Sequence, residues 1–106
     1  MGRGLASALV TKGYVIFTET IHDPEGMEAY SEMAATTLAG TPVRPLVVAR
    51  DHEVLEGEWP ATQTVVLEFE SVEAARAWYT SDAYQAAVKL RQAAADSNAV
   101  ILSGLD

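Results

Sequence analysis

The order of strand-like and helix-like runs is the feature that most constrains this fold. Residues 13–21, GYVIFTETI, are rich in β-branched and aromatic residues and are short enough for a strand. A helix is predicted directly after them, with Asp23 as its N-cap, Pro24 in its first turn and Gly40 as its C-terminal stop. The apolar residues of this helix recur at helical spacing: Met27, Tyr30, Ala34 and Leu38. The chain therefore opens with a strand followed by a helix.

The middle of the chain predicts three strands. Residues 41–45, TPVRP, are expected to form a stiff connector, because two prolines fix φ and remove hydrogen-bond donors. A strand is predicted at 46–50, and a second, short one at 52–57 after a tight turn near Asp51. Residues 62–70, TQTVVLEFE, predict a long strand with alternating faces.

The last third predicts a broken helix and a final strand. Ser71 is expected to cap one helix and Ser81 a second, with the interruption at Thr80–Ser81. Ser97 and Asn98 are expected to turn the chain into a strand at 99–105. Without the short strand, and with the two helices counted as one, the order is β-α-β-β-α-β. This is the ferredoxin-like α+β pattern.

In such a fold both helices cover the same face of the sheet, so the other face is open. Here the open face is expected to combine apolar and polar residues: Ile16, Val66, Ile101 or Leu102, Thr18, Thr64 and Glu68. A monomer seldom exposes so apolar a surface. We therefore expect two copies to stack through a two-fold axis, as a homodimeric α/β barrel.

The bulk properties exclude several classes of function. The 106 residues predict one domain at 12–106, preceded by a leader or cloning remnant at 1–11. A net charge of −8 disfavours binding to nucleic acid, and the absence of cysteine excludes disulfides and thiolate metal sites. No apolar run approaches the roughly 20 residues of a membrane span. The chain is thus expected to be cytoplasmic, with no membrane or nucleic-acid partner.

Several stretches together resemble one family. GYVIF, DPE…Y, EVLEGEWP, VVLEFES, EAARAWYTSDAYQ and LRQAAADSNAVILSG, between Gly13 and Gly104, are similar to the family known as domain of unknown function 1330. Gln63 stands where that family often has a basic residue, and Arg50-Asp51-His52 where it often has a glycine-rich turn. The resemblance implies a dimeric α/β barrel, related to antibiotic-biosynthesis monooxygenases, muconolactone isomerases and stress-response barrel proteins. It carries no established activity.

Trp59 is the first candidate site residue, in the stretch EGEWP. The indole is predicted either to form a wall of a cleft at the barrel mouth, or to cover the open end of the core while Pro60 holds the backbone extended. In the first case Glu56 or Glu58 beside it would act as an acid, a base or a hydrogen-bond acceptor. One indole can also fill both roles.

Glu68 and His52 are the candidate catalytic residues. In the interior of a dimer, loss of water would raise the pKa of Glu68 and suit it to proton transfer. The alternative is a carboxylate satisfied by an arginine or a tyrosine. His52 is predicted to lie at the cleft rim near Arg50, and Tyr14 to reach the barrel interior; Arg50 and Tyr14 are candidate ligand contacts.

The remaining arginines and aromatic residues are predicted to have structural roles, and no metal site is predicted. The two histidines, His22 and His52, lack metal-ligand spacing, and no nucleotide-binding motif is present, so neither a metal nor a cofactor is expected. Arg76 and Arg91 are expected to pair with acidic neighbours on helix surfaces. Core packing is predicted for the aromatic residues of the broken helix: Trp78, Tyr79 and Tyr84.

Two functional hypotheses follow. The first is a cofactor-independent enzyme, monooxygenase- or isomerase-like, that acts on a small apolar or aromatic compound. The second is a non-catalytic dimer that binds a metabolite or responds to stress, and a purely structural oligomeric module stands beside it. The surroundings of Glu68 separate the first two: a solvent-connected cavity favours the enzyme, and an ion-paired Glu68 favours the alternative.

Overall fold

The computed structural model describes residues 11–105. The elements in chain order are β1 (Gly13–Ile21), α2 (Pro24–Leu38), β2 (Val43–Ala49), β3 (Gln63–Phe69), α3 (Val72–Tyr79), α4 (Asp82–Ala94) and β4 (Ala95–Ser103). The predicted leader lies outside the described residues except for Thr11, whose hydroxyl is 2.8 Å from that of Ser103. No helix in the described part is long and apolar enough to cross a bilayer.

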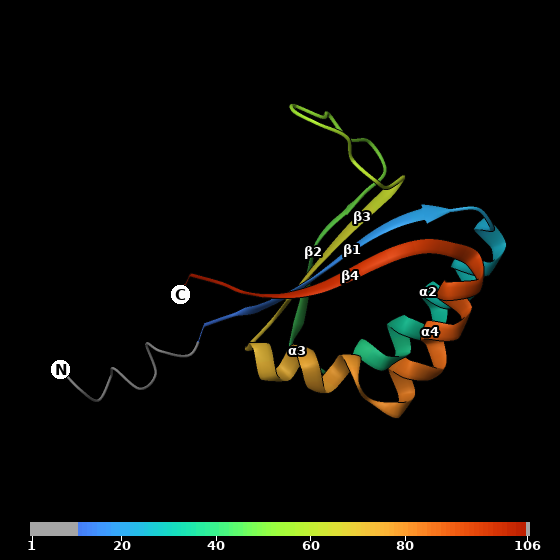
Figure 1. Cartoon of the computed structure of the whole chain (residues 1–106). Helices are drawn as coiled ribbons and strands as arrows, with labels where there is room; N and C mark the ends of the chain where they lie inside the picture. Colours follow the sequence, from blue (N-terminus) through green and yellow to red (C-terminus); the bar gives the residue numbers. More distant parts are fainter. Residues whose placement is uncertain (1–10, 106) are drawn as a thin grey trace.

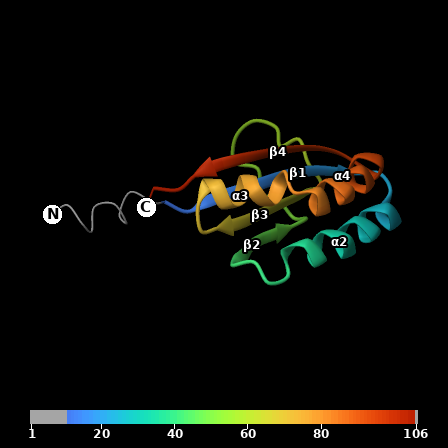
Figure 2. The same ribbon diagram turned by 90° about the horizontal axis from the view of Figure 1, so that it is seen from below.

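The four strands form one antiparallel sheet in the order β2-β3-β1-β4. All three helices lie against one face of this sheet, and the other face is left uncovered (Figures 1 and 2). The strand order and the single helical layer confirm the ferredoxin-like α+β prediction.

Side-chain caps begin the helices where the sequence predicts them. Asp23 accepts a hydrogen bond from Gly26 N at 3.1 Å, and Pro24 occupies the first turn of α2. Ser71 caps α3 and Ser81 caps α4 in the same way. The break between α3 and α4 is therefore set by a second N-cap, as expected.

Two predicted boundaries are wrong because the edge strand and the last strand start earlier. β2 begins at Val43 and includes Pro45, within the segment expected to be a connector. Proline is tolerated there because β2 is an edge strand, and a register shift lies between Pro45 and Val47. β4 begins at Ala95, directly after α4, because Ala95 pairs with Ile21 at the far end of β1.

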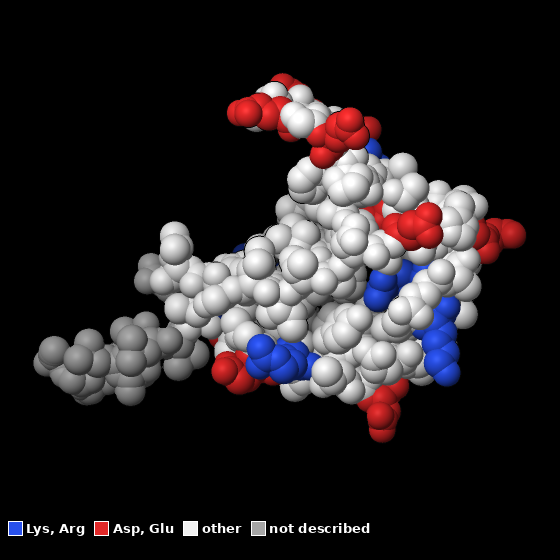
Figure 3. All heavy atoms as spheres, in the orientation of Figure 1, with Lys and Arg blue, Asp and Glu red and all other residues white. Residues whose placement is uncertain are grey.

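The predicted short strand at 52–57 does not form. Residues 50–62 instead make an irregular loop that projects from the ends of β2 and β3 (Figure 1). Acidic side chains gather on this loop (Figure 3). Leu55 is 84% exposed, so its side chain has no core to join. The alternation of apolar and acidic residues at 52–57 therefore does not lead to a strand.

The core lies between the sheet and the helices. Trp78 is at its centre, with ring centroids 4.0 Å from Tyr84 and 5.4 Å from Phe69. Trp78 and Tyr84 are buried, and Tyr79 packs against the same cluster, which confirms the predicted packing role of all three. The fold thus places this aromatic cluster on the helix side of the sheet.

The open face combines apolar and polar residues as predicted. In the register, Tyr14 is opposite Leu102 and Ile16 is opposite Val100, so these four side chains share a face. Of the two β4 candidates, Leu102 therefore lies on the open face and Ile101 does not.

Candidate functional site

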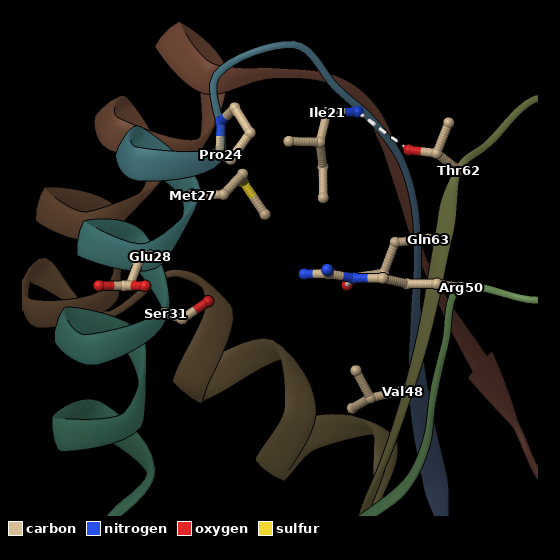
Figure 4. A pocket seen from close by; sticks show the side chains of 9 residues that line it. All are labelled: Ile21, Pro24, Met27, Glu28, Ser31, Val48, Arg50, Thr62 and Gln63. Atoms are coloured by element: carbon tan, nitrogen blue, oxygen red, sulfur yellow. Dashed lines mark hydrogen bonds between the residues drawn. The ribbon is translucent and has the colours of Figure 1, made fainter.

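A cleft lies between α2 and the neighbouring part of the sheet. Its volume is about 580 Å³. Figure 4 shows Met27 and Ser31 on the α2 side and Val48, Arg50 and Gln63 on the sheet side, with the guanidinium of Arg50 reaching toward α2. The remaining lining residues are Ile21, Pro24, Glu28 and Thr62.

A smaller cavity of about 220 Å³ continues from this cleft toward the core. The two share Met27, Ser31, Val48 and Gln63, so they are adjoining parts of one groove. The second part is also open to solvent, past the exposed residues Ala35 and Val48, and is called the inner part because core residues line its floor. The inner part is lined mainly by apolar and aromatic side chains, such as Phe17, Tyr30, Leu67 and Trp78. Small-molecule sites typically combine such an apolar wall with a few polar groups.

A chain of polar side chains runs along the sheet wall of this cleft. Arg50 Nε donates to Gln63 Oε1 at 2.9 Å, and Gln63 Nε2 donates to Glu19 Oε1 at 2.8 Å. Thr62, just before β3, is held to β1, because its backbone N–H and its hydroxyl both donate to the backbone carbonyl of Glu19. The chain connects an exposed arginine to a carboxyl group in the interior.

Glu19 is the buried end of that chain, with only 1% of its surface exposed. Burial raises the pKa of its carboxyl group, while the hydrogen bond from Gln63 and the charge of Arg91 act in the opposite direction. The residue also lines the inner cavity. The cleft therefore leads to an acid whose proton is held more tightly than that of a surface glutamate.

Arg91 is not on a helix surface, which corrects the prediction for this residue. Only 3% of it is exposed, and its guanidinium carbon lies 5.1 Å from the ring centre of Phe17 and 5.8 Å from that of Tyr30. It donates to Ser97 Oγ, and its Nε has no hydrogen-bond partner. Cation–π contacts and the charge of nearby Glu19 offset part of the cost of burial.

Two of the predicted site residues, Tyr14 and Glu68, meet on the open face. Tyr14 Oη donates to Glu68 Oε2 at 2.9 Å, and Arg44 Nη1 lies 3.5 Å from Glu68 Oε1. The hydrogen bond to Glu68 raises the pKa of Tyr14. Glu68 thus has the tyrosine and arginine partners that the structural alternative requires.

His52 and Trp59 meet at the other end of β3. His52 Nε2 and Trp59 Nε1 are 2.8 Å and 2.9 Å from the same atom, Thr64 Oγ1, and the two rings are 6.1 Å apart. Thr64 and Glu68 are four residues apart on one strand, which corresponds to about 13 Å. The open-face candidates therefore form two separate groups.

The remaining candidates lie elsewhere. Arg50 is on the helix side of the sheet, in the cleft, so it does not share a face with His52. Glu56 and Glu58 are exposed on the projecting loop. Among residues 11–105 no group of three or more His, Asp or Glu side chains is placed to hold a metal ion.

Glu19 is the residue that sequence reasoning missed. The alternation that places Val15, Phe17 and Ile21 on one face of β1 places Glu19 on that face too. A carboxylate inside an otherwise apolar strand face was the available signal.

A family model matches residues 12–105, and its description is domain of unknown function (DUF1330). The chain belongs to the DUF1330 family. The match spans the described domain almost completely, and it confirms the resemblance seen in the sequence.

Solved structures share the fold of this DUF1330 domain. RPA0582 of Rhodopseudomonas palustris, a protein of unknown function, has a TM-score of 0.70 at 20% identity over 100% of this chain and 95% of that one. SnoaB of Streptomyces nogalater, described as a cofactor-independent oxygenase, has a TM-score of 0.61 at 13% identity over 91% and 95% of the two chains.

A dimeric ferredoxin-like protein of unknown function from Thermobifida fusca has a TM-score of 0.60 at 16% identity over 91% and 93%. No curated protein matches the chain. At these identities the likeness concerns the fold, and the chemistry has to be argued from the DUF1330 domain's own residues.

Proposed function

We propose that this DUF1330 protein binds a small apolar or aromatic compound in the cleft beside α2 and moves a proton on it without a bound cofactor. One observation carries the proposal: the cleft leads to Glu19, a buried carboxyl group whose pKa is raised. A raised pKa lies nearer to pH 7, and a carboxyl group with such a pKa can both accept and release a proton at that pH. The shared fold with SnoaB, a cofactor-independent oxygenase, supports this kind of reaction.

The proton transfer can be written with the groups present. Gln63 engages Glu19 Oε1, which leaves Oε2 for the proton. An O–H bond forms at Oε2 as an acidic C–H bond of the compound breaks, and the electron pair stays on the compound as an enolate. Return of the proton to another carbon completes an isomerisation. Addition of dioxygen to the enolate would begin an oxygenation.

A thermal-shift screen with small neutral aromatic and quinone-like compounds tests the binding part. Ala35 lines the inner cavity from α2, so Ala35→Phe should fill it and abolish stabilisation by any hit. Ala29→Phe is the matched control, because Ala29 is exposed on the same helix and does not line the cleft. If no compound stabilises the wild type, or if Ala35→Phe and Ala29→Phe lose the stabilisation equally, binding in this cleft is contradicted.

Solvent exchange tests the proton transfer. Hits from the screen are incubated with the protein in D₂O, and NMR follows the replacement of their acidic C–H protons. Glu19→Gln keeps the size of the side chain and removes its ability to carry the proton. Exchange catalysed by the wild type and lost in Glu19→Gln, with binding retained, supports the enzyme.

The alternative is a non-catalytic dimer that only binds a metabolite. It is favoured by the hydrogen bonds that Glu19 and Glu68 already accept, since a carboxylate with such structural partners needs no reaction to explain it. In this case the hits bind and no exchange above the uncatalysed rate occurs in wild type or Glu19→Gln.

We further propose that the protein works as a homodimer stacked through the open face of the sheet. Support comes from the apolar side chains on that face and from the dimeric description of the Thermobifida fusca protein. In the dimer, Tyr14 and Glu68 of each copy would border an enclosed interior, with His52 and Trp59 near its end. A second pocket there, with Glu68 or His52 as its acid–base group, is tested by Glu68→Gln and His52→Ala in the same exchange assay.

A further inference from the structure

Arg50 is a cation aimed into the cleft. Its Nε is held by Gln63, which fixes the guanidinium and leaves the two terminal nitrogens directed across the opening toward α2 (Figure 4). The ion pair found among residues 11–105 joins Arg44 to Glu68, on the other face of the sheet. Arg50 therefore keeps two NH₂ groups side by side for an acceptor that arrives from outside.

The surroundings of Arg50 select a singly charged anion. Two terminal nitrogens of one guanidinium match the two oxygens of a carboxylate, which gives a bidentate pair. Glu28 lines the same opening and the protein carries a net charge of −8, whereas the charge of Glu19 is offset by nearby Arg91. A dianion such as a phosphate monoester would be repelled more strongly by these negative charges, and only Arg50 would offset its two charges.

The inner cavity selects the rest of the ligand. An apolar cavity of about 150 Å³ is known to hold benzene. The inner part of the cleft has about 220 Å³, with aromatic walls on the core side and an opening to solvent on the other, so one ring with a short substituent can lie in it. Ser31, which lines both parts, offers a hydroxyl between the ring and Arg50.

We propose that the cleft binds a small aromatic monocarboxylate, with the ring in the inner cavity and the carboxylate paired to Arg50 at the mouth. This inference rests on the proposed function, because it names the ligand class of the same cleft. It makes Arg50 the specificity-determining residue and leaves Glu19 beneath the ring end of the ligand.

Calorimetric titration of the full chain with matched acids and amides tests the ligand class. Benzoate and phenylacetate are compared with benzamide and phenylacetamide, which have the same shape and no charge, and with phenyl phosphate as a dianion. The wild type should bind the acids at least tenfold more tightly than the amides and the phosphate. Arg50→Gln should remove that preference and leave the affinity for the amides within about twofold.

Arg76→Gln is the matched control, because it removes the same charge from an exposed site on α3, away from the cleft. It should keep the acid preference. Glu28→Gln should tighten acid binding severalfold by removing a like charge from the opening.

The possible failures are distinguishable. Equal binding of acids and amides by the wild type, or an acid preference that survives Arg50→Gln, overturns the ligand class while the proposed cleft stands. Binding of none of these ring compounds overturns both the ligand class and the proposed small-molecule function.

Discussion

Glu19 is the residue whose surroundings differ most from those of a surface carboxylate, and this makes stability depend on pH. Its pKa is raised in the folded protein from an ordinary value of 4.5. The folded state therefore holds the proton more tightly than the unfolded state. The stability from this group is complete below the unfolded pKa and is lost as pH rises to the raised folded pKa.

Glu19→Gln should remove this dependence. The free energy of unfolding, measured by urea denaturation from pH 4 to pH 8, should fall in the wild type relative to the variant as pH rises above about 4.5. Subtracting the free energy of unfolding of Glu19→Gln from that of the wild type cancels the contributions of groups that titrate in both proteins. A difference that stays constant across this range would show that Glu19 is ionised in the fold at little cost.

Residue roles were harder to predict than residue positions. The sequence allows two roles for Trp59, and the structure leaves it half-exposed and hydrogen-bonded to Thr64, which is compatible with either. Arg91 resembles a surface cation in the sequence because helical periodicity shows only which residues share a stripe. Its contacts with Phe17 and Tyr30, on other elements, place it in the core. Such partners are separated in sequence, so a single chain gives no direct sign of them.

At the scale of elements, β1 and α3 meet backbone to backbone at Gly13. A Cβ on Gly13 would lie 2.4 Å from the carbonyl oxygen of Ser71 and 2.7 Å from Val72 Cα. Gly13→Ala should therefore push the start of α3 away from the sheet and destabilise the fold by about 1–3 kcal/mol. Thermal unfolding followed by circular dichroism measures the change.

Gly57→Ala is the comparison for that variant. Nothing lies within 4 Å of a Cβ there, and the cost comes only from its φ of 75° in the projecting loop. It should be milder, at about 1–2 kcal/mol. If Gly13→Ala is the milder of the two, the close approach of β1 and α3 is wrong.

The elements with a local signal were predicted well. Asp23, Ser71 and Ser81 mark helix starts through their own side chains, and all three starts are confirmed. The failed strand at 52–57 had alternation but no neighbouring strand, because the loop leaves the sheet at the ends of β2 and β3. A strand depends on pairing with distant residues, which alternation alone cannot supply.

The whole molecule presents two faces with different proposed roles. The helix side contains the cleft with Glu19 and Arg50, within a single chain. The open side contains the apolar residues expected to meet a second copy. The open face was predicted from the sequence, and its use for assembly stays a prediction. The cleft beside α2 was not predicted, because it forms between α2 and strands from three parts of the chain. Assembly and ligand binding should consequently be separable.

Leu102→Glu tests that separation. Leu102 is 48% exposed on the open face, so the substitution should leave the monomer folded. In the dimer it would bury an unpaired carboxylate from each copy, which costs about 3 kcal/mol or more and weakens association at least roughly a hundredfold. Sedimentation velocity should show wild-type dimers and Leu102→Glu monomers. Met33→Glu, on the exposed side of α2, should still be dimeric.

The monomeric variant should keep the wild-type affinity for ligands of the α2 cleft. Wild-type monomers at micromolar concentration would refute the dimer, and loss of that affinity in Leu102→Glu would show that the cleft depends on assembly.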